Sequence, residues 1–174
     1  IDFGDEDDLQ FITQETAAVI IETVQGEAGV RLADRQYFQA LRKRCDVTGA
    51  LLILDEIQCG FGRTGRFWAF DHYDIVPDIL LTAKAMGGGM PIGAFIAGEE
   101  IRSCLMNDPV LGHITTFGGH PVSAAASIAA IDTIIQQQLH EMAAEKGEQL
   151  RSLIGHNAIL EIRQIGLMLA VQFD

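Results

Sequence analysis

Residues 51–58 read Leu51-Leu52-Ile53-Leu54-Asp55-Glu56-Ile57-Gln58, an apolar run that ends in a polar cluster. The run has no apolar/polar alternation, which is typical of a parallel strand buried on both faces of a sheet. Open α/β sheets bind ligands beyond the carboxyl ends of such strands. Asp55 is therefore a candidate ligand-binding acid, and a helix cap or a solvated loop acid is the alternative interpretation.

Other segments follow the same pattern. Apolar runs without alternation occur at residues 17–21, 79–81 and 92–97. Between the first two strands, Tyr37, Phe38, Leu41 and Cys45 recur at helical spacing within residues 34–45. Strands that alternate with helices indicate an α/β fold, with a mostly parallel sheet and helices on both faces.

The C-terminal third predicts two helices and two strands. Pro121 suits the first turn of a helix that runs through small residues to about Gln138. A second amphipathic segment, residues 142–154, is expected to stop at Gly155 as its C′ residue. Strand-like segments at 159–163 and 167–173 flank Gly166.

Lys84 follows the apolar run at 79–81 and precedes Gly87-Gly88-Gly89. The apolar and glycine flanks favour a buried lysine, whose charge is costly unless it is paired or removed. A lysine amine can form a Schiff base with the aldehyde of pyridoxal phosphate (PLP), and an acid such as Asp55 can keep the pyridine nitrogen protonated, so that the ring acts as an electron sink. The pair thus suits a PLP site, although most lysines are exposed and inert.

Composition excludes several classes. The chain has 174 residues with 12 basic and 24 acidic side chains, a net charge of −12, which argues against nucleic-acid or anionic-membrane partners. No apolar segment approaches the roughly 18 residues of a membrane span. Cys45, Cys59 and Cys104 are odd in number and scattered, so we expect reduced thiols and a cytoplasmic protein. The five histidines show no ligand spacing, and we assign no metal site.

Four stretches together resemble the class III (ornithine/acetylornithine-type) PLP-dependent aminotransferases of fold type I. They occur in that family's order, at residues 21–30, 54–65, 77–84 and 113–121. The resemblance implies part of the large PLP-binding domain over residues 1–138 and the beginning of an α+β small domain over 139–174. It also implies a fragment that lacks the N-terminal half and the C-terminal end, together with the phosphate loop, the ring-stacking aromatic and the substrate-carboxylate arginine.

By this resemblance, Lys84 forms the Schiff base and shuttles a proton, and Asp55 pairs with the pyridinium nitrogen. Gln58 reaches the phenolic oxygen of the ring, and Thr116 binds the cofactor phosphate of the neighbouring subunit, which implies a homodimer with shared sites. Taken alone, Gln58 would read as a loop amide and Thr116 as part of a turn.

Glu27 matches the glutamate that pairs with the substrate-carboxylate arginine and swings aside in the second half-reaction, and Glu22 flanks the same turn. A solvated loop acid is the alternative for Glu27. Thr23 replaces the family's usual proline and His120 its usual asparagine. The second departure puts the contacts of the Thr116 loop in question.

Gly60, Gly62 and Gly65 spell G-x-G-x-x-G, a pattern of dinucleotide-binding folds. In those folds the motif follows its strand at once and opens a helix, whereas residues 55–58 intervene here. The resemblance instead implies a loop near the cofactor.

The implied reaction is ping-pong transfer of an amino group from an ω-amino donor, such as ornithine or acetylornithine, to 2-oxoglutarate. A 4-aminobutyrate-type transaminase or an aminomutase of the same fold is an alternative. A catalytically incompetent fragment or scaffold is the alternative from outside enzymes.

Overall fold

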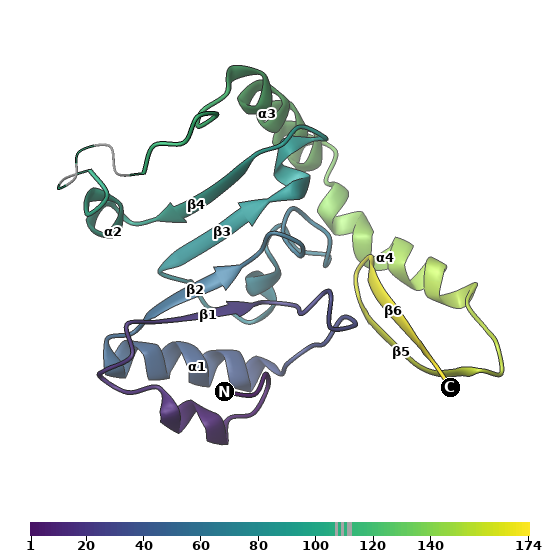
Figure 1. The fold of residues 1–174 in the computed structure, drawn as a ribbon. Coiled ribbons are helices and arrows are strands. Elements are labelled where there is room, and N and C mark those ends of the chain that lie inside the picture. Colours follow the sequence, from purple (N-terminus) through teal and green to yellow (C-terminus); the bar gives the residue numbers. More distant parts are fainter. Residues whose placement is uncertain (107, 109, 111–112) are drawn as a thin grey trace.

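A computed structural model describes residues 1–106, 108, 110 and 113–174. Four strands form one sheet in the order β1-β2-β3-β4 (Figure 1). They span Ala18–Glu22, Leu51–Asp55, Ile79–Ala83 and Gly93–Ala97. β1, β2 and β3 are parallel, and β4 runs antiparallel to β3. The predicted α/β class is confirmed.

Helix α1 (Arg35–Thr48) covers one face of this sheet. Its buried side chains Phe38 and Leu41 pack in one cluster with Leu52 and Leu54 of β2. The helix ends at Gly49, whose φ of 79° is the left-handed conformation that glycine adopts without strain, and whose N–H donates to the Cys45 carbonyl at 2.9 Å. The 3₁₀ turn η1 (Asp7–Phe11) adds Leu9 to the cluster.

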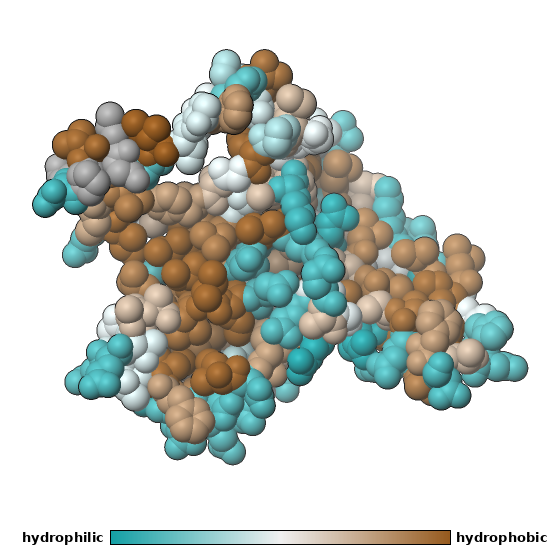
Figure 2. Space-filling model, viewed as in Figure 1, coloured by the Kyte–Doolittle hydropathy of each residue, from teal (hydrophilic) through white to brown (hydrophobic). Residues whose placement is uncertain are grey.

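The opposite face of the sheet is open in this chain. Ile20 of β1 is 65% exposed and Phe95 of β4 is 41% exposed, and Figure 2 shows hydrophobic residues gathered over the sheet. The prediction of strands buried on both faces is therefore wrong for the described residues, because α1 and η1 pack on only one of them. The pattern of uninterrupted apolar residues indicates two covered faces but cannot show what covers the second.

Four further elements follow strands β2, β3 and β4. The 3₁₀ turns η2 (Ala69–His72) and η3 (Lys84–Gly87) follow β2 and β3, and the short helix α2 (Glu99–Ser103) follows β4. Helix α3 (Pro121–Gln136) packs on η3.

The C-terminal part consists of helix α4 and one hairpin. α4 (Leu139–Ser152) is followed by the antiparallel strands β5 (Ile159–Ile165) and β6 (Met168–Phe173). The chain changes direction between α3 and α4 at Gln138, which has a φ of 52°. This lies beside the predicted domain boundary at 138/139, but the division into two domains stays a prediction.

Gly155 does not end α4 as predicted. The helix stops at Ser152, and the N–H groups of Leu153 and Ile154 donate to the carbonyls of Leu150 and Arg151 at 3.1 Å. These i→i−3 bonds tighten the last turn and use the free carbonyls, so no left-handed residue is needed.

Within the described ranges, no helix has both the length and the hydropathy needed to cross a bilayer. No group of three or more histidine, cysteine and acidic side chains suited to a metal occurs among the same residues.

Candidate active site

Three of the predicted site residues lie at one edge of the sheet. Glu22 ends β1 and Asp55 ends β2, and the two are register partners. Asp55 also pairs with Leu81 of β3, three residues before Lys84. Because the carboxyl ends of parallel strands meet at one end of the sheet, Glu22, Asp55 and Lys84 lie at the same end, and their role in one site stays a prediction.

Asp55 is half-buried and keeps part of its carboxylate available. Its Oδ1 accepts the Ile57 N–H at 2.9 Å, and no side chain of the described residues bonds its Oδ2. The residue helps to line a cavity of about 310 Å³ together with Glu22 and Gln25. The structure thus presents a carboxylate oxygen to a ligand at the strand end.

Lys84 has a left-handed backbone with a φ of 45°. A non-glycine residue in that conformation costs on the order of 1–3 kcal/mol, and such residues concentrate at functional sites. The strain is held in place by close packing, because a Cβ added at Gly88 would lie 3.0 Å from the Ala130 Cβ of α3. Small residues on α3 therefore allow η3, which carries Lys84, to pack closely against this helix.

The lysine side chain itself is exposed in this chain. The expectation of a buried lysine is thus wrong for the described residues. The reason is that α3, β3 and β4 pack against η3 but do not cover the Lys84 side chain. The flanking apolar and glycine residues serve the backbone fit of η3 and do not enclose the amine.

Glu56 is a site residue that the sequence analysis missed. It is fully buried, and its two carboxylate oxygens accept the N–H groups of Ala69 and Phe70 at 2.8 and 2.9 Å. Burial raises the pKa of Glu56, and these hydrogen bonds partly oppose that rise. The side chain anchors the loop between β2 and η2 directly beside Asp55. Its partners are backbone groups, so no side-chain pattern in the sequence indicated it.

Gln58 contacts Glu27, the acid expected to pair with the substrate-carboxylate arginine. Its Nε2 donates to Glu27 Oε1 at 2.8 Å. A Cβ added at Gly26 would lie 1.4 Å from Gln58 Oε1, so only glycine leaves room for the amide at this turn. Glu22 supports the same turn, because its Oε2 accepts the Gly26 N–H at 3.2 Å. The structure thus brings Glu22, Glu27 and Gln58 together.

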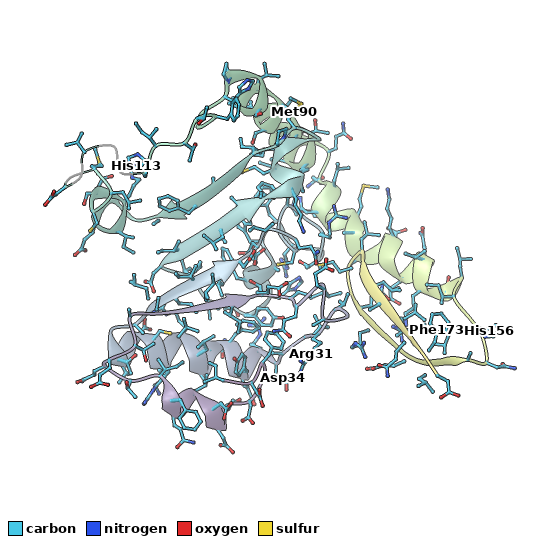
Figure 3. All side chains as sticks on the ribbon, in the orientation of Figure 1. Arg31, Asp34, Met90, His113, His156 and Phe173 are labelled. Carbon is cyan, nitrogen blue, oxygen red and sulfur yellow. The ribbon has the colours of Figure 1, made fainter. Side chains whose placement is uncertain are left out.

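Thr116 lines a different cavity from Asp55. It is exposed and lines a cavity of about 480 Å³ with His120 and Ser123 at the start of α3, and with Gly93 at the start of β4. Lys84, Asp55 and Gln58 are not among the residues that line this cavity. Figure 3 shows His113 beside α2 and Met90 near α3. The role of Thr116 in a neighbour's site stays a prediction.

The G-x-G-x-x-G segment packs against the C-terminal part of the chain. A Cβ added at Gly62 would lie 2.7 Å from the His140 Cβ of α4, and one at Gly65 would lie 3.5 Å from the Ala144 Cβ. No α-helix follows these glycines directly, since η2 is a four-residue 3₁₀ turn. The dinucleotide interpretation therefore has no structural support, and the glycines serve helix packing.

Comparison with known proteins agrees with this geometry. Residues 6–174 match the family Aminotransferase class-III. The acetylornithine aminotransferases of Methanocaldococcus jannaschii and Methanopyrus kandleri are 44% and 43% identical to the chain over 100% and 99% of its length. The chain spans 44% of the length of each of these relatives.

Solved structures show the same similarity. An ornithine aminotransferase from Toxoplasma gondii, described with partial occupancy of PLP at its active site, superposes with a TM-score of 0.90 at 34% identity over 100% of this chain and 42% of that one. The acetylornithine aminotransferase of Elizabethkingia anophelis gives a TM-score of 0.90 at 33% identity over 100% of this chain and 45% of that one. The chain belongs to the class-III aminotransferase family, within the PLP-dependent transferases of fold type I.

Proposed function

We propose that this chain carries the lysine, acid and amide of a PLP-dependent transaminase. The amino group would pass from an ω-amino donor of the ornithine or acetylornithine type to 2-oxoglutarate by a ping-pong mechanism. The observation that carries the proposal is the placement of Asp55 and Lys84 at the carboxyl ends of the neighbouring parallel strands β2 and β3. The names of the relatives support the choice of donor.

The chemistry of the donor set fits PLP. Asp55 offers a carboxylate oxygen that has no partner among the described side chains, and Lys84 offers an amine on a strained, tightly packed backbone. Gln58 adds an amide within the same group of loops. When bound, PLP supplies an electron sink for the bonds of an attached amine.

Each side chain then has a definite task. Asp55 would hold a proton at the ring nitrogen, because a carboxylate stabilises a neighbouring cation. Lys84 would hold the cofactor covalently and move a proton at its Nζ. Gln58 would bond the phenolic oxygen, and Glu27 with Glu22 would control access to a carboxylate-binding arginine supplied from outside residues 1–174.

The proposal includes a homodimer in the cytoplasm. Thr116 would bind the cofactor phosphate of the partner subunit, and its place in a cavity at the start of α3 that Lys84 does not line supports this role. Cys45, Cys59 and Cys104 are all free thiols, as proteins of a reducing compartment generally have. We also propose residues 1–138 as part of the large domain and 139–174 as the beginning of the small one.

A donor screen tests this function. The full chain that contains residues 1–174 is loaded with PLP and offered acetylornithine, ornithine or 4-aminobutyrate with 2-oxoglutarate, and glutamate release is measured. Acetylornithine or ornithine is expected to give the highest kcat/KM. A clear preference for 4-aminobutyrate would contradict the proposed donor, and no turnover with any amine would contradict the enzyme.

A further inference from the structure

The C-terminal hairpin is hydrogen-bonded to the turn that carries Glu27. Arg163 of β5 donates from Nε to the carbonyl oxygen of Gly29 at 2.7 Å, across 134 positions of sequence. The guanidinium approaches so closely that a Cβ added at Gly29 would lie 2.9 Å from Arg163 Nη2. Gly29 has a φ of 91°. The backbone conformation therefore favours glycine here, and a larger residue would also displace the arginine.

The turn itself is narrow and held at both ends. Gln25 and Arg31 exchange backbone hydrogen bonds of 3.1 and 3.0 Å, and the Gly29 N–H donates to the Gly26 carbonyl at 3.0 Å. Glu22 holds Gly26 at one end, and Arg163 holds Gly29 at the other. Glu27 lies between these two anchors.

The Arg163 side chain is partly buried and is held by several polar contacts. Its side chain is 27% exposed, its Nη1 donates to Gln172 Oε1 of β6 at 2.9 Å, and it forms an ion pair with Glu161. Apolar packing also joins the hairpin to the turn, because Met168 of β6 lies in one buried cluster with Val24 and Val30 on the two sides of the turn.

We propose that Arg163 is a positioning residue for donor selectivity, acting through the turn that holds Glu27 on Gln58. The inference rests on the gating function proposed for Glu27. Glu27 is exposed and is held by one side-chain hydrogen bond, at 2.8 Å. Its position therefore depends on the backbone on either side. Loss of the Arg163 hydrogen bond leaves the Gly29 end of the turn without its anchor. Glu27 then breaks its hydrogen bond to Gln58 more often. As a result, the carboxylate-binding arginine becomes accessible to α-amino donors.

The chain offers a matched control for this arginine. Arg151 of α4 also donates from its guanidinium to a backbone carbonyl, that of Ile162 in β5, at 3.1 Å. It supports the same hairpin but does not contact the Glu27 turn. Arg151→Gln therefore shows how far a weaker attachment of the hairpin alone changes the measured selectivity.

The experiment compares Arg163→Gln, Arg163→Lys and Arg151→Gln in the full chain. The first readout is the ratio of kcat/KM for the ω-amino donor to that for glutamate. Arg163→Gln is expected to lower this ratio by about tenfold, as loss of one charged hydrogen bond would. Arg163→Lys keeps a cationic donor and should fall between that variant and wild type, while Arg151→Gln should leave the ratio unchanged.

Two further readouts separate positioning from other effects. In the cofactor-free protein, hydrogen–deuterium exchange at the Gly29 and Arg31 amides should be faster in Arg163→Gln and unchanged in Arg151→Gln. In the Glu27→Ala background, Arg163→Gln should lower the ratio no further, because both changes act through one carboxylate.

Several outcomes would overturn the proposal. An unchanged ratio in Arg163→Gln despite faster exchange would show that the turn does not set selectivity. An equal fall in Arg151→Gln would assign the effect to the hairpin as a whole. A wild-type enzyme without ω-amino activity would refute the proposed function, and the exchange measurement would still decide whether Arg163 holds the turn.

Discussion

Two adjacent acids at the end of β2 have different tasks. Asp55 is half-buried at the edge of the sheet, where a ligand can reach it, whereas Glu56 is fully buried and binds the backbone of Ala69 and Phe70. β2 ends at Asp55, and the carboxylate of the next residue, Glu56, is turned to the N–H groups of Ala69 and Phe70. One acid serves the candidate site, and the other holds the loop that follows it.

Asp55→Asn is expected to keep the fold and to lower kcat strongly. An amide cannot hold a proton at the ring nitrogen, and loss of such a charged contact amounts to about 3 kcal/mol, or on the order of 100-fold in kcat. Steady-state kinetics of the full chain measure this, with Asp132→Asn on the exposed surface of α3 as control. Turnover near wild type in Asp55→Asn would remove Asp55 from the mechanism.

Glu56→Gln is expected to change how stability depends on pH. Because burial raises the pKa of Glu56, the folded state holds this proton more tightly than the unfolded state. Its contribution to the free energy of unfolding is therefore largest below the ordinary pKa of about 4.3 and falls as pH rises through the raised value. Urea denaturation between about pH 4 and pH 7 should show this fall in wild type and its absence in Glu56→Gln.

The control for that measurement is Glu148→Gln, at an exposed position of α4. This variant should retain the wild-type pH profile. A Glu56→Gln profile parallel to wild type would show that Glu56 is not the source of the dependence.

The sequence alone singles out Asp55 and Lys84, because strand ends and isolated lysines leave a local signal. The structure places both at the carboxyl ends of neighbouring strands, and their shared role stays a prediction. Glu56 could not be separated from its polar neighbours, since its partners are backbone groups of Ala69 and Phe70 that no side-chain pattern reveals. The exposed state of Lys84 was missed for a similar reason. Burial depends on distant segments, and residues 79–89 alone do not report it.

At the scale of elements, most of the fold followed from hydrophobic periodicity. All four strands of the main sheet, α1, α3, α4 and the hairpin begin within three residues of the predicted positions. Packing between elements was not predictable in the same way. Gly62 and Gly65 contact α4, and Arg163 contacts Gly29, because these pairs are brought together only by the tertiary fold.

Gly147→Ala is expected to destabilise the protein, although the position lies inside helix α4. In an exposed helix this change stabilises by up to about 1 kcal/mol. Here the added Cβ would lie 1.9 Å from the Gly166 carbonyl oxygen in the turn of the hairpin. The overlap should move α4 away from the hairpin and lower the free energy of unfolding by about 1–3 kcal/mol.

Thermal or urea unfolding measures this effect. Gly155→Ala is the control, because nothing lies within 4 Å of a Cβ added there. Equal or greater stability of Gly147→Ala would show that α4 and the hairpin are not packed as described.

At the scale of the molecule, the sheet is unfinished. β1 and β4 are both edge strands, and the face with Ile20 and Phe95 is exposed. Exposed edges and apolar faces favour association with other chains. The sequence pattern predicted covered strands, and within one copy of the described residues this face stays exposed.

Residues 1–174 expressed alone are therefore expected to associate and not to transaminate. Lys84 is exposed, and Thr116 lines a cavity that lacks Lys84 and Asp55, so the described residues do not enclose one complete site. Analytical sedimentation and an assay with ornithine and 2-oxoglutarate test both points. A monomer that converts ornithine would contradict the shared-site role proposed for Thr116.

Covalent labelling shows which lysine attaches the cofactor. The full chain is loaded with PLP, reduced with borohydride and digested, and the modified peptide is mapped. The sequence of residues 1–174 holds three lysines, Lys43, Lys84 and Lys146, and only Lys84 follows a strand beside Asp55. We expect a pyridoxyl group on Lys84, and a label on Lys43 or Lys146 with none on Lys84 would rule out Lys84 as the attachment point.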